Sequence, residues 1–224
     1  MHRESKDMMK EKEIRGVIFD IDGVLLDSMG IWKDLGARYL LRRGKEPEKD
    51  LSKVLYSMSM EQGASYLKDH YALKETEDEI LDGIQNMLRD YYFYEVNAKK
   101  DALSLMKMFR DKGIRMTAAT SSPREHVEKA LARNGLLPYL DRIFTCTEAG
   151  ASKHTPEIFI AASDFMGTEK KETCVFEDSL YALETAAKAG YHTVGVYDEN
   201  GDPDQKKLKE VSEVYIRDLS ELLE

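Results

Sequence analysis

The sequence predicts an α/β protein, in which a doubly wound parallel sheet carries a helical segment inserted after its first strand. Two observations support this prediction. Helix-like and strand-like segments alternate after residue 98, and an interval without this alternation separates them from an apolar, strand-like run at residues 17–19. Parallel sheets with helices on both faces produce such alternation, because the crossover between two parallel strands is usually a helix.

The first strand is predicted at residues 17–19, where an apolar run ends in Asp20-Ile21-Asp22. A buried strand does not normally end in two carboxylates so close together, because like charges disfavour each other's ionisation. The arrangement is sensible if a divalent cation lies there, since hard oxygen ligands suit Mg²⁺ and the cation offsets their repulsion. Gly23 then lets the backbone turn tightly beside the site.

The alternation after residue 98 consists of helix–strand pairs bounded by turn and cap residues. Apolar spacing predicts helices over about 102–109, 123–131, 156–166 and 180–189, and apolar runs predict strands at 114–119, 142–145, 173–176 and 191–196. Ligands of parallel sheets gather at the carboxyl ends of the strands. Polar residues that follow these strands are therefore candidate site residues.

Several polar residues lie where that rule places a site. Thr120-Ser121-Ser122 follows the second strand, Glu177-Asp178 follows the strand that ends at Phe176, and Lys153 precedes a helix that begins near Pro156. We expect them to converge with the two aspartates on one edge of the sheet.

Each of these residues also has a structural interpretation. Thr120 could cap the helix that follows it, and Glu177-Asp178 could be an acidic first turn favoured by the helix dipole. Asp20 and Asp22 could belong to a turn or to a structural cation site. Lys153 is one of 33 basic residues, so this lysine by itself does not indicate a functional site. The functional interpretation rests on the combination.

The ordered motifs Asp20-Ile21-Asp22, Thr120, Lys153 and Glu177-Asp178 resemble those of the haloacid dehalogenase-like hydrolase superfamily, from about Gly16 onward. The stretch FDIDGVLLDS is similar to its β-phosphoglucomutase-like and phosphoglycolate phosphatase-like branch. The resemblance implies a Rossmann-like core formed by residues 1–28 and 98–224. It also implies an inserted helical cap at residues 29–97, whose closure would exclude water and choose the substrate.

The resemblance implies chemical roles that fit the residue types. Asp20 would attack phosphorus and carry an aspartyl-phosphate, while Asp22 would protonate the leaving oxygen and later deprotonate water. Lys153 and Thr120 would contact the phosphoryl oxygens. Ser121, with backbone amides at the following helix start, would complete the phosphate cradle.

The resemblance also implies a Mg²⁺ ion. Asp20 and Asp178 would supply carboxylate oxygens to it, and Asp22 its backbone carbonyl. Glu177 would bind the ion as well, through water. Together with Gly23 at the tight turn beside the phosphate, these residues complete the predicted site.

We therefore predict a Mg²⁺-dependent phosphatase that hydrolyses a small phosphorylated metabolite through an aspartyl-phosphate. The main alternative is a sugar phosphomutase. It is disfavoured because residues 55–61 contain no arginine, where β-phosphoglucomutases carry a Gly-Val-x-Arg-like element that binds the distal phosphate. A noncatalytic phosphate-binding protein is disfavoured because binding alone would require neither Asp20 nor Asp22, and a dehalogenase because Asp22 and the acidic pair serve phosphoryl transfer.

The predicted cap is harder to interpret. Its interval is too long for a bare loop, and two helix faces fit it. They comprise Trp32, Leu35, Tyr39 and Leu40, and Ile80, Ile84, Met87 and Tyr91. Trp32, Met58, Met60 and residues 91–94 could line a substrate pocket or pack in the core. His154 could touch the leaving group or be exposed to solvent.

The composition limits the kinds of molecule to which the protein is expected to bind. A net charge of −9 argues against a nucleic-acid or anionic-membrane surface, and no apolar stretch is long enough to span a bilayer. The charged residues 1–13 lack the apolar centre of a secretion signal and are expected to be a frayed lead-in. Cys146 and Cys174 are interpreted as reduced core residues of a cytoplasmic protein. We expect a monomer or weak homodimer that acts on a small molecule.

Overall fold

The computed structural model describes residues 13–55 and 58–223. Apart from Glu13, the predicted lead-in therefore lies outside the described residues, as do Tyr56 and Ser57 of the predicted cap loop. The chain divides into two compact units, one formed by residues 1–28 with 96–224 and the other by residues 29–95. The second unit is thus an insertion in the chain of the first.

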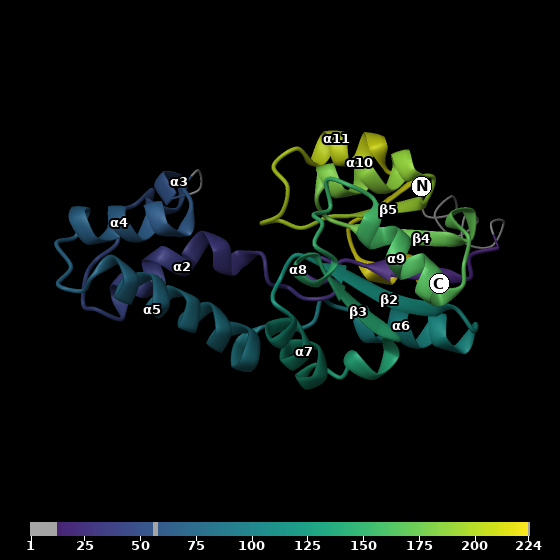
Figure 1. Ribbon diagram of the computed structural model, residues 1–224, viewed down its shortest axis with the longest axis horizontal. Coiled ribbons are helices and arrows are strands. Elements are labelled where there is room, and N and C mark those ends of the chain that lie inside the picture. Colours follow the sequence, from purple (N-terminus) through teal and green to yellow (C-terminus); the bar gives the residue numbers. More distant parts are fainter. Residues whose placement is uncertain (1–12, 56–57, 224) are drawn as a thin grey trace. The chain divides into compact units, whose positions relative to one another are not determined.

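The larger unit contains a six-stranded parallel sheet with the strand order β3-β2-β1-β4-β5-β6 (Figure 1). Its strands are β1 (Gly16–Phe19), β2 (Arg115–Thr120), β3 (Arg142–Thr145), β4 (Thr173–Glu177), β5 (His192–Val196) and β6 (Val214–Ile216). β1 lies between β2 and β4, where the direction of travel across the sheet reverses. Ligands of open parallel sheets bind at such a switch point, outside the carboxyl ends of the strands.

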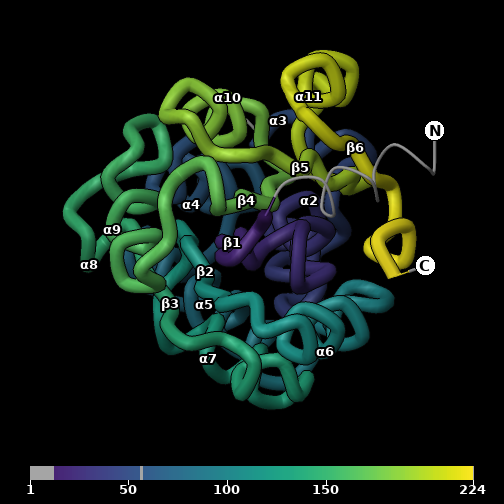
Figure 2. Tube along the Cα trace, turned by 90° about the vertical axis from the view of Figure 1, so that its right-hand side faces the viewer, coloured from purple at the N-terminus to yellow at the C-terminus, as the bar shows by residue number. Residues whose placement is uncertain are grey.

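Helices cover both faces of this sheet. They are α6 (Ala102–Asp111), α7 (Arg124–Arg133), α8 (Cys146–Ala149), α9 (Glu157–Met166), α10 (Leu180–Ala189) and α11 (Gln205–Val211), with 3₁₀ turns at Leu137–Tyr139, Lys170–Glu172 and Leu219–Leu222. Figure 2 shows α6 and α7 on one side of the sheet and α9, α10 and α11 on the other. Right-handed crossovers require this arrangement, because the direction across the sheet reverses after β3. The predicted doubly wound α/β fold is confirmed.

Alternate residues of the central strands pack on opposite faces of the sheet. Ile18 and Val175, which are partners across β1 and β4, belong to a core cluster that also contains residues of α9 and α10. Their neighbours Phe19 and Phe176 pack instead with Phe109 of α6, with ring centroids 4.9–6.2 Å apart. Burial on both faces explains the continuous apolar runs of these strands. It also means that the residues at the strand ends start from a rigid frame.

The smaller unit is entirely helical in its regular structure. It consists of α2 (Gly30–Leu41), α3 (Leu51–Leu55), α4 (Met60–His70) and α5 (Glu77–Asp90), followed by a π-helical turn at Tyr91–Glu95. α5 packs against both α2 and α4. Capping boxes formed by Ser59 with Gln62 and by Thr76 with Glu79 begin α4 and α5, so two otherwise unpaired backbone N–H groups are satisfied at each start. Among the described residues, no helix is both long and apolar enough to cross a membrane.

Two details of the smaller unit differ from the prediction. Trp32, predicted to share a face with Leu35, is 47% exposed, and Ile31 takes the buried position one turn before Leu35 instead. The helix predicted to include Tyr91 ends at Asp90. A wider, π-helical turn comes next, and its buried residue is Tyr92. Neighbouring residues of a helix point about 100° apart around its axis. The apolar pattern alone therefore does not decide which of two adjacent apolar residues faces the core.

The other cap residues singled out in the sequence are divided between core and surface. Tyr92 is buried, Met58 and Met60 are half-buried, and Tyr94 is 72% exposed. Core packing accounts for Tyr92, and a substrate contact by the others stays a prediction.

Candidate active site

β1 leads directly into the first two candidate residues. The backbone N–H of Asp20 donates to the carbonyl oxygen of Phe176 at 2.9 Å, which extends the pairing with β4 past the end of the strand. The chain then turns tightly, and the N–H of Leu25 donates to the carbonyl of Ile21 at 3.0 Å. Gly23 has a φ of +79° in this turn, a conformation that residues with a Cβ rarely adopt. The strand pairing and the turn together set the direction of Asp20.

Three carboxylates from two adjacent strand ends form an acidic cluster. One oxygen each of Asp20, Glu177 and Asp178 lies within 4.8 Å of the others, and the residues are only 8%, 1% and 4% exposed. In the described part of the chain, no other group of three or more His, Cys, Asp or Glu side chains comes together in this way. Burial raises the pKa of Asp178 well above its usual range, and the charges of Asp20 and Glu177 add to this effect.

Lys153 partly neutralises the acidic cluster. Its ammonium group is buried and donates to Oδ1 of Asp20 and, at 2.7 Å, to Oε1 of Glu177. Burial opposes the charge on Lys153, but the two carboxylates outweigh this effect and hold the pKa of Lys153 above its ordinary value. Burial raises the pKa of Asp20 to about 8, with Lys153 opposing the rise and Glu177 adding to it. One lysine among three carboxylates leaves the cluster short of positive charge.

Asp22 has neutral hydrogen-bond partners instead. Its Oδ1 accepts from the hydroxyl of Ser28 and its Oδ2 from the hydroxyl of Ser122, each at 2.6 Å. The carboxylate of Asp22 is therefore oriented by two donors and does not belong to the acidic cluster. The backbone carbonyl, which the family resemblance implies as its metal contact, is not engaged by these side-chain contacts.

The segment after β2 contributes the next candidate residues. Thr120 is fully buried, and its Oγ1 accepts from the backbone N–H of Ser122 at 3.0 Å, a local hydrogen bond of the kind that stabilises turns. Ser121 is exposed, and its Oγ lies 3.4 Å from Sγ of Cys146. The turn thus directs Ser122 towards Asp22 while Ser121 projects to the surface.

The prediction that both cysteines are reduced core residues is confirmed for Cys174, which is buried in β4, and Cys146 is half-buried and packs against the edge of the core cluster. β3 ends at Thr145, however, whose side chain accepts from the N–H of Glu148 and so begins α8. Cys146 is therefore the half-buried first residue of a short helix and not the continuation of a strand.

The loop after β5 adds residues that the sequence pattern did not indicate. Asp198 is nearly fully buried and forms an ion pair with Lys99 at 2.6 Å. A Cβ added at Gly201 would lie 2.9 Å from Oδ2 of Asp178, so only glycine allows this close approach. Asn200-Gly201 is a turn signal, but the sequence does not say that the turn reaches the acidic cluster.

Asn134, the residue that follows α7, anchors the chain where it re-enters the larger unit. Its Nδ2 donates to the carbonyl of Val96 at 3.1 Å, and its Oδ1 accepts from the N–H of Ala98 at 2.8 Å. The N–H of Lys99 also donates to the carbonyl of Leu25, at 2.9 Å. Residues 96–99 are therefore attached to the turn that follows Asp22.

The acidic cluster has the donor set that Mg²⁺ prefers. Its three carboxylates supply hard oxygen ligands close enough together to share one ion. The raised pKa values of Asp20 and Asp178 are the expected result of burying these groups without a divalent cation to offset their charge. The residues present thus fit the predicted ion.

Comparisons with known proteins agree with this site. The model of the haloacid dehalogenase-like hydrolase family matches residues 14–190. A phosphorylated carbohydrates phosphatase of Thermotoga maritima is 24% identical over 181 residues, which cover 81% of this chain and 84% of the relative. Hexitol phosphatase A of Escherichia coli is 24% identical over 199 residues, 88% of each chain. A solved structure from Thermotoga maritima, described as a β-phosphoglucomutase, has a TM-score of 0.83 at 24% identity and covers 94% of this chain and 97% of that one.

A doubly wound sheet whose central strand ends in an aspartate held by a buried lysine, beside an acidic pair on the adjacent strand, is the frame that the family match covers. The family match extends over most of this frame, from β1 to the end of α10. The chain belongs to the haloacid dehalogenase-like hydrolase family, and the resemblance noted in its motifs is confirmed.

Proposed function

We propose that this protein is a Mg²⁺-dependent phosphatase that hydrolyses small phosphorylated metabolites through an aspartyl-phosphate on Asp20. The observation that carries the proposal is the buried contact of Lys153 with Asp20 and Glu177, beside Asp178. Phosphoryl transfer depends mainly on positioning and charge neutralisation, and a carboxylate held next to a fixed cation provides both.

In the first half-reaction, a carboxylate oxygen of Asp20 attacks phosphorus and the bond between phosphorus and the leaving oxygen breaks. Asp22 gives a proton to that oxygen, so the metabolite leaves as an alcohol. Lys153 and the hydroxyl of Thr120 stabilise the charge on the phosphoryl oxygens, and Ser121 and the turn at Gly23 complete the phosphate site. The product of this step is the aspartyl-phosphate.

In the second half-reaction, Asp22 accepts a proton from water as the water oxygen bonds to phosphorus. The bond between Asp20 and phosphorus breaks, which releases inorganic phosphate and restores both aspartates. The partners of Asp22 support this double role. A serine hydroxyl can donate to a carboxylate or accept from a carboxylic acid by rotating, so Ser28 and Ser122 suit both protonation states.

The carboxylates of Asp20, Glu177 and Asp178 would hold the Mg²⁺ ion, together with the backbone carbonyl of Asp22. The ion supplies positive charge that offsets the repulsion between the attacking carboxylate and the phosphoryl oxygens. Lys153 would act beside the ion, because it pairs directly with Asp20 and Glu177. Neither cation alone balances the charge of three carboxylates and a phosphoryl group.

We propose a phosphorylated carbohydrate or polyol as the substrate. Two relatives that align with more than four-fifths of this chain are a phosphorylated carbohydrates phosphatase and a hexitol phosphatase, and these names support the proposal. The inserted helical unit is the part of the chain to which we assign the choice among such substrates. The absence of arginine at residues 55–61 supports a phosphatase over a phosphomutase, because a bisphosphate intermediate needs a second anion site.

A phosphate-release screen tests the proposal. Purified protein is incubated with sugar phosphates, polyol phosphates, nucleotides and phosphoglycolate, with Mg²⁺ or with a chelator, and Asp20→Asn is the matched control. We expect Mg²⁺-dependent release from sugar or polyol phosphates that the control lacks. Release from no phosphomonoester would contradict the phosphatase, and isomerisation of a sugar phosphate faster than phosphate release would identify a phosphomutase instead.

A further inference from the structure

The imidazole ring of His154 stacks on the phenol ring of Tyr181 next to the catalytic cluster. The ring centroids are 4.2 Å apart and the planes are inclined by 24°. His154 belongs to the loop between α8 and α9, and Tyr181 belongs to the first turn of α10. Both residues are exposed, Tyr181 by 40%, so burial in the core does not account for the contact.

Each member of this pair is close to a site residue along the chain. His154 follows Lys153, whose ammonium contacts Glu177 at the end of β4. Tyr181 lies on α10, which begins after the Glu177-Asp178 pair, and burial together with the charge of Glu177 raises the pKa of Tyr181. The same two chain segments are therefore joined twice, by an inner ionic contact of Lys153 and by an outer aromatic contact of His154.

The outer contact is important because the loop has few other attachments. Within the described residues, the remaining hydrogen bonds of residues 151–155 reach only partners between Cys146 and Glu157. Lys153 itself and the ring stack are thus the contacts that fasten this loop to the segment after β4.

The inner contact cannot fix the loop throughout a catalytic cycle. When a phosphoryl group enters, the ammonium of Lys153 must turn part of its hydrogen bonding from the carboxylates to the phosphoryl oxygens. The ring stack does not depend on those charges. It can therefore keep the loop in place while the inner contact is exchanged.

We propose that the stacked pair His154–Tyr181 positions Lys153 for phosphoryl transfer. This inference rests on the proposed function of the site. It assigns the effect to the ring contact and gives the imidazole no part in proton transfer, so His154 and Tyr181 are positioning residues. A displaced catalytic group lowers the rate steeply, and a shift of about 1 Å can cost about 100-fold.

Kinetic variants test the ring contact. His154→Ala and Tyr181→Ala should each lower kcat about tenfold, with KM changed less than about threefold, because the group is displaced but the binding contacts remain. His154→Phe and Tyr181→Phe retain a ring and should stay within about twofold of the wild type. The double alanine variant should be no worse than either single variant, since both remove the same contact.

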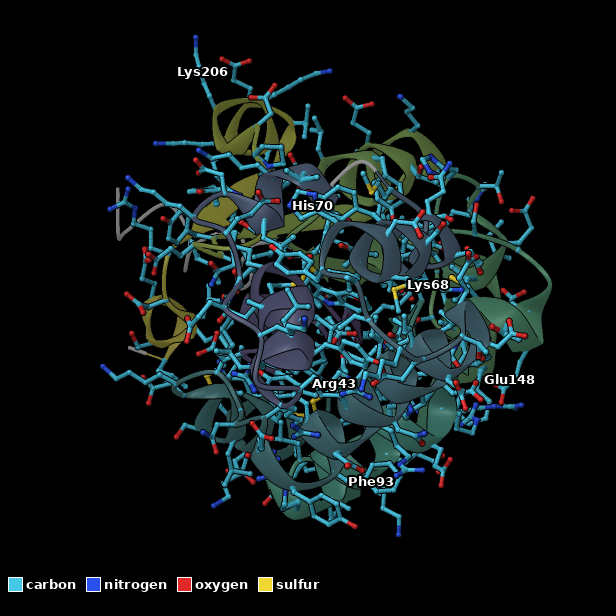
Figure 3. All side chains as sticks on the ribbon, turned by 90° about the vertical axis from the view of Figure 1, so that its left-hand side faces the viewer. Arg43, Lys68, His70, Phe93, Glu148 and Lys206 are labelled. Carbon is cyan, nitrogen blue, oxygen red and sulfur yellow. The ribbon has the colours of Figure 1, made fainter. Side chains whose placement is uncertain are left out.

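A chemical measurement that needs no substrate accompanies the kinetics. Acylation of lysines by an amine-reactive ester, followed by mass spectrometry, reports how well Lys153 is protected in the folded protein. Lys153 is 3% exposed, whereas the side chain of Lys206 is 89% exposed, points away from α11 and serves as the internal standard (Figure 3). Relative to Lys206, the acylation of Lys153 should rise at least about fivefold in His154→Ala and stay unchanged in His154→Phe.

The outcomes separate this inference from the function on which it rests. If His154→Phe is as slow as His154→Ala and shifts the pH profile, the imidazole acts chemically and the ring-contact proposal is wrong. If His154→Ala matches the wild type in kcat and in acylation of Lys153, the loop does not need the stack. If no phosphomonoester is hydrolysed but acylation of Lys153 rises only in the alanine variants, the function fails while the positioning contact stands.

Discussion

The surroundings of Asp20 and those of Asp22 differ in kind, although only one residue separates the two aspartates in the chain. Asp20 lies among charged groups, with Lys153 as its ion-pair partner and Glu177 close by. Asp22 lies between the hydroxyls of Ser28 and Ser122. The first region is dominated by burial and charge, and the second by neutral hydrogen bonds.

Under the proposed mechanism, this difference lets one short segment supply two catalytic functions. A nucleophile that must approach an anion benefits from fixed cations, which the surroundings of Asp20 provide. A group that donates and then accepts a proton needs partners that serve both of its protonation states, which hydroxyls do. Changes around Asp20 should therefore act on charge and metal binding, and changes around Asp22 on proton transfer.

The largest effect is expected from Asp20→Asn. Loss of the nucleophile should lower kcat/KM at least about 10⁴-fold, because an amide cannot form the aspartyl-phosphate. Phosphate release measured with the best substrate of the screen gives kcat/KM for the variant and for the wild type. Thermal unfolding serves as the control for folding, and a folded variant that still hydrolyses p-nitrophenyl phosphate would disprove the mechanism.

Asp22→Asn should lower kcat about 10³-fold on an alkyl phosphate, whereas with p-nitrophenyl phosphate the rate of phosphoenzyme formation should fall much less and only its hydrolysis should remain slow. The reason is that nitrophenolate leaves without protonation, so formation of the aspartyl-phosphate no longer needs an acid. Rapid-quench measurement of the phosphoenzyme should find that it accumulates with p-nitrophenyl phosphate. Equal losses on both substrates, without accumulation, would show that Asp22 does not transfer the proton.

Lys153→Met keeps an unbranched side chain, shorter by one atom, and removes its charge. We expect kcat to fall about 100-fold, as when one donor to a developing charge is lost, and the Mg²⁺ concentration needed for half-maximal rate to rise. The second effect follows because the carboxylates lose the cation that holds them in place. Steady-state rates across a Mg²⁺ titration measure both, and a variant with normal rates would remove Lys153 from the site.

The stability of the Mg²⁺-free protein should depend on pH through the acidic cluster. A carboxyl group whose folded pKa is raised stabilises the protein fully below its unfolded pKa, and this contribution is lost as pH rises through the folded value. With the pKa of Asp20 at about 8 and that of Asp178 also raised, the loss should extend from about pH 4 to pH 8.

Asp178→Asn tests this pH dependence, because it keeps the shape of the side chain without its charge. At pH 8 the Mg²⁺-free variant should exceed the wild type in free energy of unfolding by at least about 1 kcal/mol, and near pH 4 the two should agree. Urea denaturation in a chelator at several pH values provides the comparison. A difference that does not vary with pH would contradict the assignment to Asp178.

The smallest effects are expected around Asp22, from Ser122→Ala and Ser28→Ala. Each removes one hydroxyl that orients the carboxylate and should lower kcat about three- to tenfold, since a hydrogen bond to a charged group contributes about 1.5–3 kcal/mol and the remaining hydroxyl still orients Asp22. The pH–rate profile should shift in both variants. Ser104→Ala is the matched control, because Ser104 is an exposed residue of α6 that has no place in the proposed site. An unchanged profile in Ser122→Ala would rule out a role in orienting the proton donor.

The fold could be predicted from the sequence because its decisive signals are local. The apolar runs of β1 and β4, the turn at Gly23 and the alternation of helices and strands depend on residues close together in the chain. Handedness and sheet topology then bring the strand ends to one edge. Asp20, Lys153, Glu177 and Asp178 accordingly meet where the strand order implies.

Other contacts could not be predicted, because they depend on how loops turn in space. Neither the ring stack of His154 on Tyr181 nor the hydrogen bond of Ser122 to Asp22 follows from spacing, since the partners come from different loops. The half-burial of Cys146 has a related cause, because the side chain of Thr145 caps a short helix that takes Cys146 to the edge of the core. Such contacts need the tertiary structure.

The ammonium of Lys153 and the carboxylate of Asp20 are separated by 133 positions in the chain. During translation, the nucleophile therefore leaves the ribosome long before the lysine, and the acidic pair follows later still. A polypeptide released before residue 178 lacks the complete cluster, however well its first elements are folded. We therefore expect translation products that end before residue 178 to be inactive, because they lack one carboxylate of the proposed metal site.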